Sequence, residues 1–305
     1  MPRGRMTLLS AAERRYCEPM LRGFARRFPD VDLDFVFGVS TDLQRRFQQE
    51  IDAGGPTADL FWSSAMDQQM SLVMAGHAQP HGVRHMLPPS ATYRDLAVAT
   101  TCEPLFTLCR DPSSPAGTPA EIAALIMADP QRFRGRIALL DIETNGLGFL
   151  AMLKWSADPG FDEFLDGLAF CSPRTAGSAP ALIDAVTGGA ELAPHLLGAY
   201  ALRATAGNPS LHLARSAAPA LAVSRVAFIP KRAANPEAAS AFLSYMLSTE
   251  GQAAIGEAGL FPIAAQPAMP VAPIPIDDCF VDLIDPKARA ELLARWRKAL
   301  GRPIR

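Results

Sequence analysis

Cysteine is scarce in this sequence of 305 residues, which contains five, an odd number, and no CxxC pair. No disulfide framework can be read from such a count. Cys102 and Cys109 are close enough in sequence to bridge a hairpin, but they are also explained as buried free thiols, which pack like small hydrophobic side chains. The cysteines therefore do not indicate whether the protein resides in an oxidising or a reducing compartment.

Long apolar runs are missing as well. No run reaches the roughly 18 residues that a membrane-spanning helix requires. The N-terminal stretch MPRGRMTLLSAAERR is basic, but its apolar part, residues 6–12, is interrupted by polar residues. A secretory signal needs an apolar core of about 7 to 15 residues, so none is visible. We expect either a cytoplasmic protein or an exported one whose signal has been removed or is encoded upstream of Met1.

The chain also lacks an excess of charge of one sign. Its 29 basic and 31 acidic residues give a formal net charge of −2. This balance provides no electrostatic preference for nucleic acid or for an anionic membrane surface. Neither is therefore expected as a partner.

Catalytic motifs are absent from the sequence. It contains no HExxH, GxSxG, Walker A or GxGxxG motif and no carboxylate pair suited to acid–base chemistry. His77, His81 and His85 are spaced four apart, but the glycine and proline residues around them break any helix that would align them. We therefore predict no catalytic residue, no metal site and no cofactor.

What the sequence does contain is the material for a large core. Hydrophobic residues make up 49% of the chain and charged residues 20%, which is typical of a globular protein. The length suits two lobes of roughly 100 to 150 residues each. Strand and helix patterns alternate along the chain, which indicates an α/β fold with parallel strands. We predict strands over residues 6–10, 31–37, 60–62, 97–109, 136–141 and 221–229, and helices over residues 11–28, 42–52, 66–75, 120–128, 146–155, 178–186, 236–247, 248–256 and 286–300.

Small polar residues stand at four points where a predicted strand turns into a helix. They are Ser40-Thr41, Ser63-Ser64, Asn145-Gly146 and Gly177-Ser178. A helix N-terminus offers unpaired backbone N–H groups and the positive end of the helix dipole, and hydroxyl groups add further donors. Several such ends together favour binding of an anion, although ordinary helix capping also uses these residue types. Ligands of open α/β sheets bind beyond the carboxyl ends of the strands, where all four points lie.

Several segments resemble a known family. GVSTDLQRRFQQE and ADLFWSSAMDQQMSLVMAGHA are similar to the first lobe of periplasmic solute-binding proteins of ABC transporters, in the branch of ferric-ion and sugar-phosphate or phosphoglycerate receptors. GRIALLDIETNGLGFL resembles the second-lobe strand and ligand loop of that family. VSRVAFIPKRAANPEAASAFLSYMLSTEGQAAIGEAGLFPI resembles its C-terminal signature, with a helix after Asn-Pro-Glu-Ala-Ala and a second one containing Ser-x-x-Gly-Gln. The resemblance covers about residues 6–265.

The resemblance implies a type 2 periplasmic-binding fold. In that fold, two α/β lobes, each a mixed sheet flanked by helices, are joined by two crossing strands and close over a ligand. The first lobe would comprise residues 1–100 and 224–270, and the second lobe residues 101–223 and 271–305. Two of the four helix starts would then lie on each lobe and face the cleft.

The resemblance also bears on the ligand. Ferric-binding members carry adjacent tyrosines, whereas this sequence has the single Tyr200, preceded by Ala199. Ser40-Thr41 matches the Ser-Thr pair of phosphate-recognising members, and Ser63-Ser64 resembles the WSS turn of the same branch. Arg225, beside the expected hinge, would either give an anion its charge partner or pair with Glu103.

We therefore expect a receptor, not an enzyme, that captures a small anion, either an organic phosphate or a carboxylate. Its ligand-binding residues would be Ser40, Thr41, Ser63, Ser64, Asn145, Gly146, Ser178, Tyr200 and Arg225; His195 and Arg203 are further candidates, or else packing and surface residues. The receptor would act as a monomer in the periplasm, closing on its ligand and delivering it to the permease of an ABC importer. Three alternatives remain open: a ferric-ion or ferric-complex receptor, a ligand sensor for a membrane kinase, and an enzyme of this architecture such as a transferase.

Overall fold

The computed structural model describes residues 1–264 and 270–303, which form two compact units. Of the described residues, unit 1 contains 1–103, 223–264 and 273–282, and unit 2 contains 104–222, 270–272 and 283–303. Residues 273–282, which the sequence analysis assigned to the second lobe, lie in unit 1. They do so because the Ile276 N–H donates to the Ser90 carbonyl at 2.8 Å and Arg94 pairs with Asp278 at 3.3 Å.

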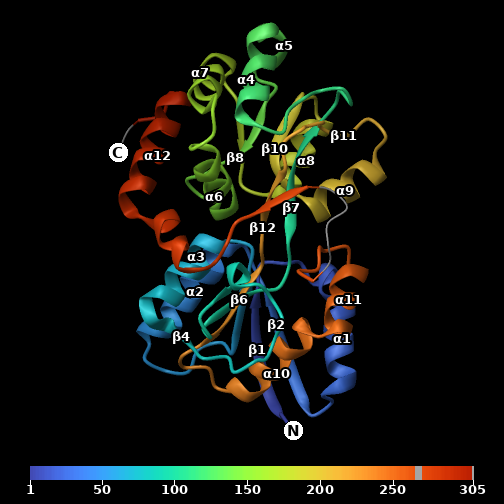
Figure 1. Cartoon of the computed structure of the whole chain (residues 1–305), viewed down its shortest axis with the longest axis vertical. Coiled ribbons are helices and arrows are strands. Elements are labelled where there is room, and N and C mark those ends of the chain that lie inside the picture. The colour runs from blue at the N-terminus through green and yellow to red at the C-terminus, as the bar shows by residue number, and fades with distance from the viewer. Residues whose placement is uncertain (265–269, 304–305) are drawn as a thin grey trace. The chain divides into compact units, whose positions relative to one another are not determined.

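Figure 1 labels most helices of unit 1 and several of its strands. Its helices are α1 (Glu18–Arg27), α2 (Ser40–Asp52), α3 (Met66–Leu72), α10 (Pro236–Leu247) and α11 (Thr249–Glu257). Its strands are β1 (Gly4–Ser10), β2 (Val31–Phe37), β3 (Leu60–Ser63), β4 (Ala78–Gln79), β5 (Thr92–Tyr93), β6 (Ala97–Ala99) and β13 (Val226–Pro230). Shorter helical segments are the 3₁₀ helices η1 (Arg14–Tyr16), η3 (Pro89–Ala91) and η4 (Asp278–Ile284) and the π-helical turn η2 (Val73–His77).

The seven strands of unit 1 form one mixed sheet. Its order is β2-β1-β3-β13-β6-β5, and β4 pairs with β13. Strands β1, β2 and β3 are parallel, so their carboxyl ends lie at one edge, whereas β13 is antiparallel to β3 and β6. Phe47 of α2 packs on Phe61 of β3 and Phe228 of β13. Figure 1 shows α1 and α11 on one side of this sheet and α2 and α3 on the other.

Two predicted strands are each divided in the structure. The expected strand over residues 97–109 is β6 followed by β7 (Glu103–Cys109), and that over 221–229 is β12 (Ala220–Val223) followed by β13. The divisions arise because each pair contributes to two different sheets. Between them the chain forms other bonds: the Thr100 N–H donates to the Arg225 carbonyl at 3.0 Å, and the Cys102 N–H donates to the Phe261 carbonyl at 2.9 Å.

Unit 2 carries the remaining elements. Its helices are α4 (Pro119–Ala128), α5 (Pro130–Phe133), α6 (Gly146–Trp155), α7 (Phe161–Cys171), α8 (Ala179–Thr187), α9 (Gly198–Gly207) and α12 (Pro286–Ala299). Strands β10 (Leu192–Leu197), β7, β12 and β14 (Val271–Pro273) follow one another in a five-stranded sheet, in which β11 (His212–Leu213) also pairs with β7. Strands β8 (Ala138–Leu140) and β9 (Arg174–Ala176) are paired in parallel.

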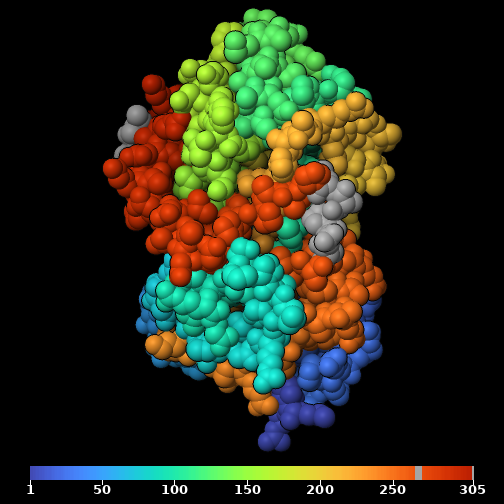
Figure 2. Space-filling view, in the orientation of Figure 1, coloured from blue at the N-terminus to red at the C-terminus, as the bar shows by residue number. Residues whose placement is uncertain are grey.

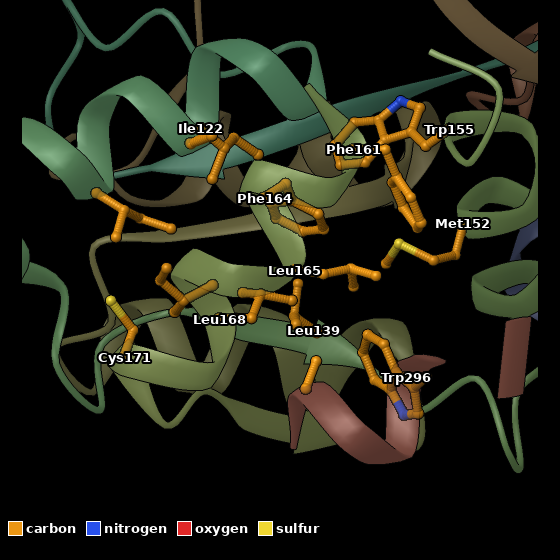
Figure 3. Close-up of a cluster of buried hydrophobic side chains, with 14 of the residues drawn as sticks. Ile122, Leu139, Met152, Trp155, Phe161, Phe164, Leu165, Leu168, Cys171 and Trp296 are labelled. Carbon is orange, nitrogen blue, oxygen red and sulfur yellow. The ribbon is translucent and has the colours of Figure 1, made fainter. Parts of the chain in front are cut away.

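The core of unit 2 forms around α6, α7 and α12. Figure 3 shows Trp296 pointing from α12 into a cluster that includes Leu139 of β8 and Leu165 of α7. Leu292, Trp296 and Ala299, spaced three and four apart, are the buried face of α12. In Figure 2 the red surface of the C-terminal residues lies against the yellow-green surface of α6 and α7. The helix that the sequence predicts over residues 286–300 therefore completes the core of this unit.

Local sequence signals account for most helix boundaries. Asn145, Ser178, Asn235 and Ser248 each accept a hydrogen bond from a backbone N–H in the first turn of the helix that follows. Gly76 breaks the helical backbone of η2, which directly follows α3, with a φ of 82°, a left-handed conformation that glycine adopts without strain. The predicted first helix begins later than expected, because residues 11–13 form a loop and Arg14–Tyr16 a separate turn before α1. No helix within the described residues has the length and apolar character needed to cross a membrane.

Candidate functional site

Ser40 and Ser63 lie together at the carboxyl edge of the parallel strands of unit 1. Ser63 is the last residue of β3 and Ser40 the first of α2, and their Oγ atoms are 3.3 Å apart. We call these two residues the hydroxyl pair. Ser63 is fully buried, whereas Ser40 is half-buried. Either hydroxyl can donate in this contact. One donor and several lone pairs thus lie beside the first turn of a 13-residue helix.

The hydroxyl pair does not serve as a helix cap. The N-cap positions of α2 and α3 are Val39 and Ala65, and neither helix has a side-chain cap bond. Ser63 Oγ instead accepts the Ala65 N–H at 3.1 Å. Ordinary capping, the alternative that the sequence left open, is therefore not what holds Ser40 and Ser63 here. Thr41 is half-buried at the second position of α2, and Ser64 is buried in the loop after β3.

Arg225 is buried between β12 and β13 with a carboxylate partner. Its Nε is 2.6 Å from Oε1 of Glu103, and the exposed fractions of the two side chains are 2% and 0%. The guanidinium also lies over the ring of Trp62, 5.5 Å from the centroid. The structure thus shows the Glu103 pairing that the sequence analysis gave as one of two roles. A ligand contact of Arg225 stays a prediction.

Hydrogen bonds extend from this ion pair to both neighbouring chain segments. The Arg225 N–H donates to Thr101 Oγ1 at 2.9 Å, and Thr101 Oγ1 donates to Glu103 Oε1 at 3.1 Å. Trp62 Nε1 donates to Thr100 Oγ1 at 2.7 Å, which in turn donates to the Arg225 carbonyl at 2.9 Å. The network joins β3 to the residues at which the chain passes between the units, near 103 and 223.

In unit 2, Asn145 and Ser178 cap neighbouring helices. Asn145 Oδ1 accepts the Gly148 N–H at 2.8 Å, and Ser178 Oγ accepts the Ala181 N–H at 3.4 Å. Asn145 Nδ2 also donates to the Gly177 carbonyl at 3.1 Å, so the loops before α6 and α8 are tied together. The structure brings these two predicted sites together as a unit 2 cap pair. Capping uses one acceptor of each side chain, and the ligand role stays a prediction.

Close packing of α6 on β8 requires glycine near this point. A Cβ at Gly148 would lie 2.6 Å from the Cβ of Leu140, closer than side chains approach one another. Glycine therefore lets the first turn of α6 approach the strand. Gly146, the first residue of α6, is buried in the same turn.

The remaining candidates of unit 2 lie on β10 and α9. Tyr200 is half-buried in the first turn of α9, and Arg203, one turn later, is exposed. His195 lies in β10 at an irregularity in its pairing with β7, with a φ of 63° that is uncommon outside glycine. Its ring packs on Trp155, with centroids 4.0 Å apart, and burial lowers its pKa to about 3.

Two histidines of the unit 1 loop, His81 and His85, lie near each other. His81 is buried, its Nδ1 accepts the Val83 N–H at 3.1 Å, and burial lowers its pKa. The rings of His81 and His85 are 6.0 Å apart. Throughout residues 1–264 and 270–303, no three His, Cys, Asp or Glu side chains are grouped so as to hold a metal ion.

Sequence reasoning missed the arginines that contact the loop before α6. Arg302 donates to Asp141 and to Glu143, and Arg297 donates to Glu143. The signal was available in the excess of arginine at the end of the terminal helix, but nothing in the sequence indicates that this end reaches residues 141–143.

Comparisons with known proteins identify the family. Residues 10–261 match the model of the bacterial extracellular solute-binding proteins. The solved structure of a substrate binding protein of the ABC transporter from Agrobacterium tumefaciens is 26% identical, with a TM-score of 0.89 over 98% of this chain and 94% of that one. A comparison with curated protein sequences finds no significant match.

Two further solved structures are less similar in sequence and show the fold. AfuA from Actinobacillus pleuropneumoniae, with fructose-6-phosphate bound, is 18% identical, with a TM-score of 0.75 over 98% of this chain and 99% of that one. Iron-bound HitA from Pseudomonas aeruginosa is 17% identical, with a TM-score of 0.72 over 97% and 99%. The chain therefore has the two-lobed α/β fold of ABC-transporter receptors and belongs to the bacterial extracellular solute-binding proteins.

Proposed function

We propose that this solute-binding receptor captures a small organic anion, an organic phosphate or a carboxylate, and delivers it in the periplasm to the permease of an ABC importer. The hydroxyl pair of Ser40 and Ser63 carries the proposal, because it lies at the start of α2 without capping it. Hydroxyl and backbone N–H donors at a helix N-terminus suit an anion. Fructose-6-phosphate, which is bound in the AfuA structure, belongs to the same chemical class.

Charge balance in unit 1 favours recognition through these neutral donors. The positive charge of Arg225 faces the buried carboxylate of Glu103. An anion at the hydroxyl pair would then be held by hydrogen bonds and by the dipole of α2 more than by a full opposite charge. No bond is made or broken in such binding, which fits a receptor.

A thermal-shift screen of the purified protein tests the proposal. The panel contains sugar phosphates, phosphoglycerates, inorganic phosphate, di- and tricarboxylates, and ferric ion with and without citrate. A ligand at 100 times its Kd adds about 2.7 kcal/mol to the free energy of unfolding, which raises the melting temperature measurably. We expect a shift with one class of organic anion. A shift with ferric ion alone would reject the proposal and favour a ferric receptor that uses Tyr200.

Replacement of Ser40 by alanine should weaken binding of that anion. The variant removes one hydroxyl, and a hydrogen bond to a charged group contributes about 1.5 to 3 kcal/mol. We expect the Kd, measured by isothermal titration calorimetry, to rise roughly 10- to 150-fold.

Ser71→Ala is the matched control, because Ser71 is exposed on α3 of the same unit. Its Kd should equal that of the unmodified protein, and both variants should melt at nearly the same temperature without ligand. An unchanged Kd in Ser40→Ala would remove the hydroxyl pair from the binding site.

A further inference from the structure

The C-terminal segment of unit 2 forms a compact cluster of ion pairs with the loop that leads into α6. We call Asp141, Glu143, Arg297 and Arg302 the carboxylate–arginine cluster. Arg297 donates from Nε and Nη2 to Glu143 Oε2 at 2.9 and 2.8 Å. Arg302 Nη1 donates to Asp141 Oδ2 at 3.0 Å and to Glu143 Oε1 at 2.9 Å. Two carboxylates are thus matched by two guanidinium groups.

These contacts are more protected from solvent than ordinary surface ion pairs. The exposed fractions are 18% for Asp141, 24% for Glu143, 18% for Arg297 and 32% for Arg302. Hydrogen bonds from Arg297, and then from Arg302, hold the pKa of Glu143 below its usual value. Partly buried charges in a network interact more strongly than isolated exposed pairs. The cluster can therefore influence both the conformation of the residues beside it and the electrostatic potential around them.

The cluster lies directly beside the unit 2 cap pair, Asn145 and Ser178. Asp141 begins the loop before α6, and its carbonyl accepts the Asn145 N–H at 2.8 Å. Arg302 Nη2 also donates to Thr175 Oγ1 at 2.9 Å, on β9 and three residues before Ser178. The guanidinium of Arg302 therefore forms hydrogen bonds to the segments that precede Asn145 and Ser178.

Apolar residues of α12 anchor the helix to the core of unit 2. Leu292, Trp296 and Ala299 already bury the apolar face of the helix in the core. The arginines extend instead from its end toward two carboxylates. Without them, two negative charges would stand within a few residues of Asn145, and an anion bound there would be repelled.

We infer that the unit 2 cap pair binds part of the organic anion and that Arg297 and Arg302 are positioning residues for it, because they neutralise Asp141 and Glu143 and tie down the loops before α6 and α8. The inference rests on the proposed function, because it assigns the ligand to the anionic class. By this inference, the C-terminal segment also helps to determine the charge of the ligand that binds at the unit 2 cap pair.

Charge rescue tests this inference. The probes are fructose-6-phosphate and citrate, titrated at low ionic strength into the full-length protein. We expect Arg297→Gln with Arg302→Gln to raise the Kd of the bound probe about tenfold. Adding Asp141→Asn and Glu143→Gln to that variant should bring the Kd back to within about threefold of the original, because the uncompensated charges are gone.

The control removes the same charge from another part of the segment. Arg295 pairs with Asp162 on α7 and Lys298 is exposed, so Arg295→Gln with Lys298→Gln alters net charge equally. This control should leave the Kd unchanged. Equal Kd values for Arg297→Gln/Arg302→Gln and the unmodified protein would overturn the inference, and so would a fourfold variant that binds as weakly as the double one.

Hydrogen exchange separates this inference from the proposed function. Failure of the unmodified protein to bind any organic anion would reject the proposed function. The positioning role is still measured without ligand, as amide exchange over residues 141–148 and 174–179. We expect faster exchange there in Arg297→Gln/Arg302→Gln than in the control variant. Equal exchange in the two variants would show that the arginines do not hold these loops.

Discussion

Glu103→Gln should lower the free energy of unfolding of unit 1 by about 3 to 5 kcal/mol. Glu103 and Arg225 form an ion pair that is almost completely buried, and the glutamine leaves the guanidinium charge buried without its counter-charge. The expected loss is a large part of the 5 to 15 kcal/mol that stabilises a typical domain. Urea denaturation followed by circular dichroism measures the loss, and hydrogen exchange of the β3 and β13 amides assigns it to unit 1.

Two comparisons distinguish a buried-charge effect from a general loss of packing. Arg45→Gln removes one partner of an exposed pair with a 2.7 Å contact and should cost less than about 1 kcal/mol. Glu103→Leu combined with Arg225→Met removes both charges and should be more stable than Glu103→Gln, because no charge is left buried alone. If Glu103→Gln were as stable as Arg45→Gln, the pair would be more solvated than its burial indicates.

The stability of unit 2 should fall steeply as the pH drops below 6.5, and His195 should be a main cause. Burial lowers its pKa to about 3 in the folded protein, against 6.5 for an accessible histidine. The unfolded chain therefore binds a proton between these pH values and the folded chain does not, so the stabilisation present above pH 6.5 is lost as the pH falls toward 3. At 1.36 kcal/mol for each pH unit, the total is roughly 5 kcal/mol.

His195→Asn is the variant that isolates this effect. Asparagine tolerates the left-handed backbone at a φ of 63° and carries no titrating group. The variant should be less stable at pH 7, because the packing on Trp155 is lost, but its stability should change less on acidification. Urea denaturation at pH 7 and 4.5 should show a difference of roughly 3 kcal/mol between the two pH responses. If the stability of the unmodified protein and that of His195→Asn changed equally between pH 7 and 4.5, His195 would bind its proton as readily in the folded protein as in the unfolded chain.

Much of the fold could be predicted from local patterns. The alternation VDLDFVF predicts a strand over residues 31–37, and these are the bounds of β2, an edge strand of the unit 1 sheet. Asn235 and Ser248 predicted the starts of α10 and α11, because capping is a bond between neighbouring residues. The C-terminal family signature contains both of these starts.

The candidate site could be predicted only in part. Ser40, Ser63, Asn145 and Ser178 were singled out because a strand followed by a small polar residue and a helix indicates a helix start. Their neighbours in space were not predictable. The 3.3 Å contact of Ser40 with Ser63 joins residues 23 positions apart, and the contact of Arg302 with Asp141 joins residues 161 positions apart.

The sequence by itself determined the class of this protein: an α/β chain with helix starts suited to an anion and the signature of a solute-binding family. Tertiary structure alone decided that Ser40 and Ser63 do not cap their helices, that Arg225 faces Glu103, and that the C-terminal arginines reach the loop before α6. The reason is physical. Capping and periodicity depend on residues a few positions apart, whereas the partner of a charge depends on which distant strands and helices the hydrophobic core brings together.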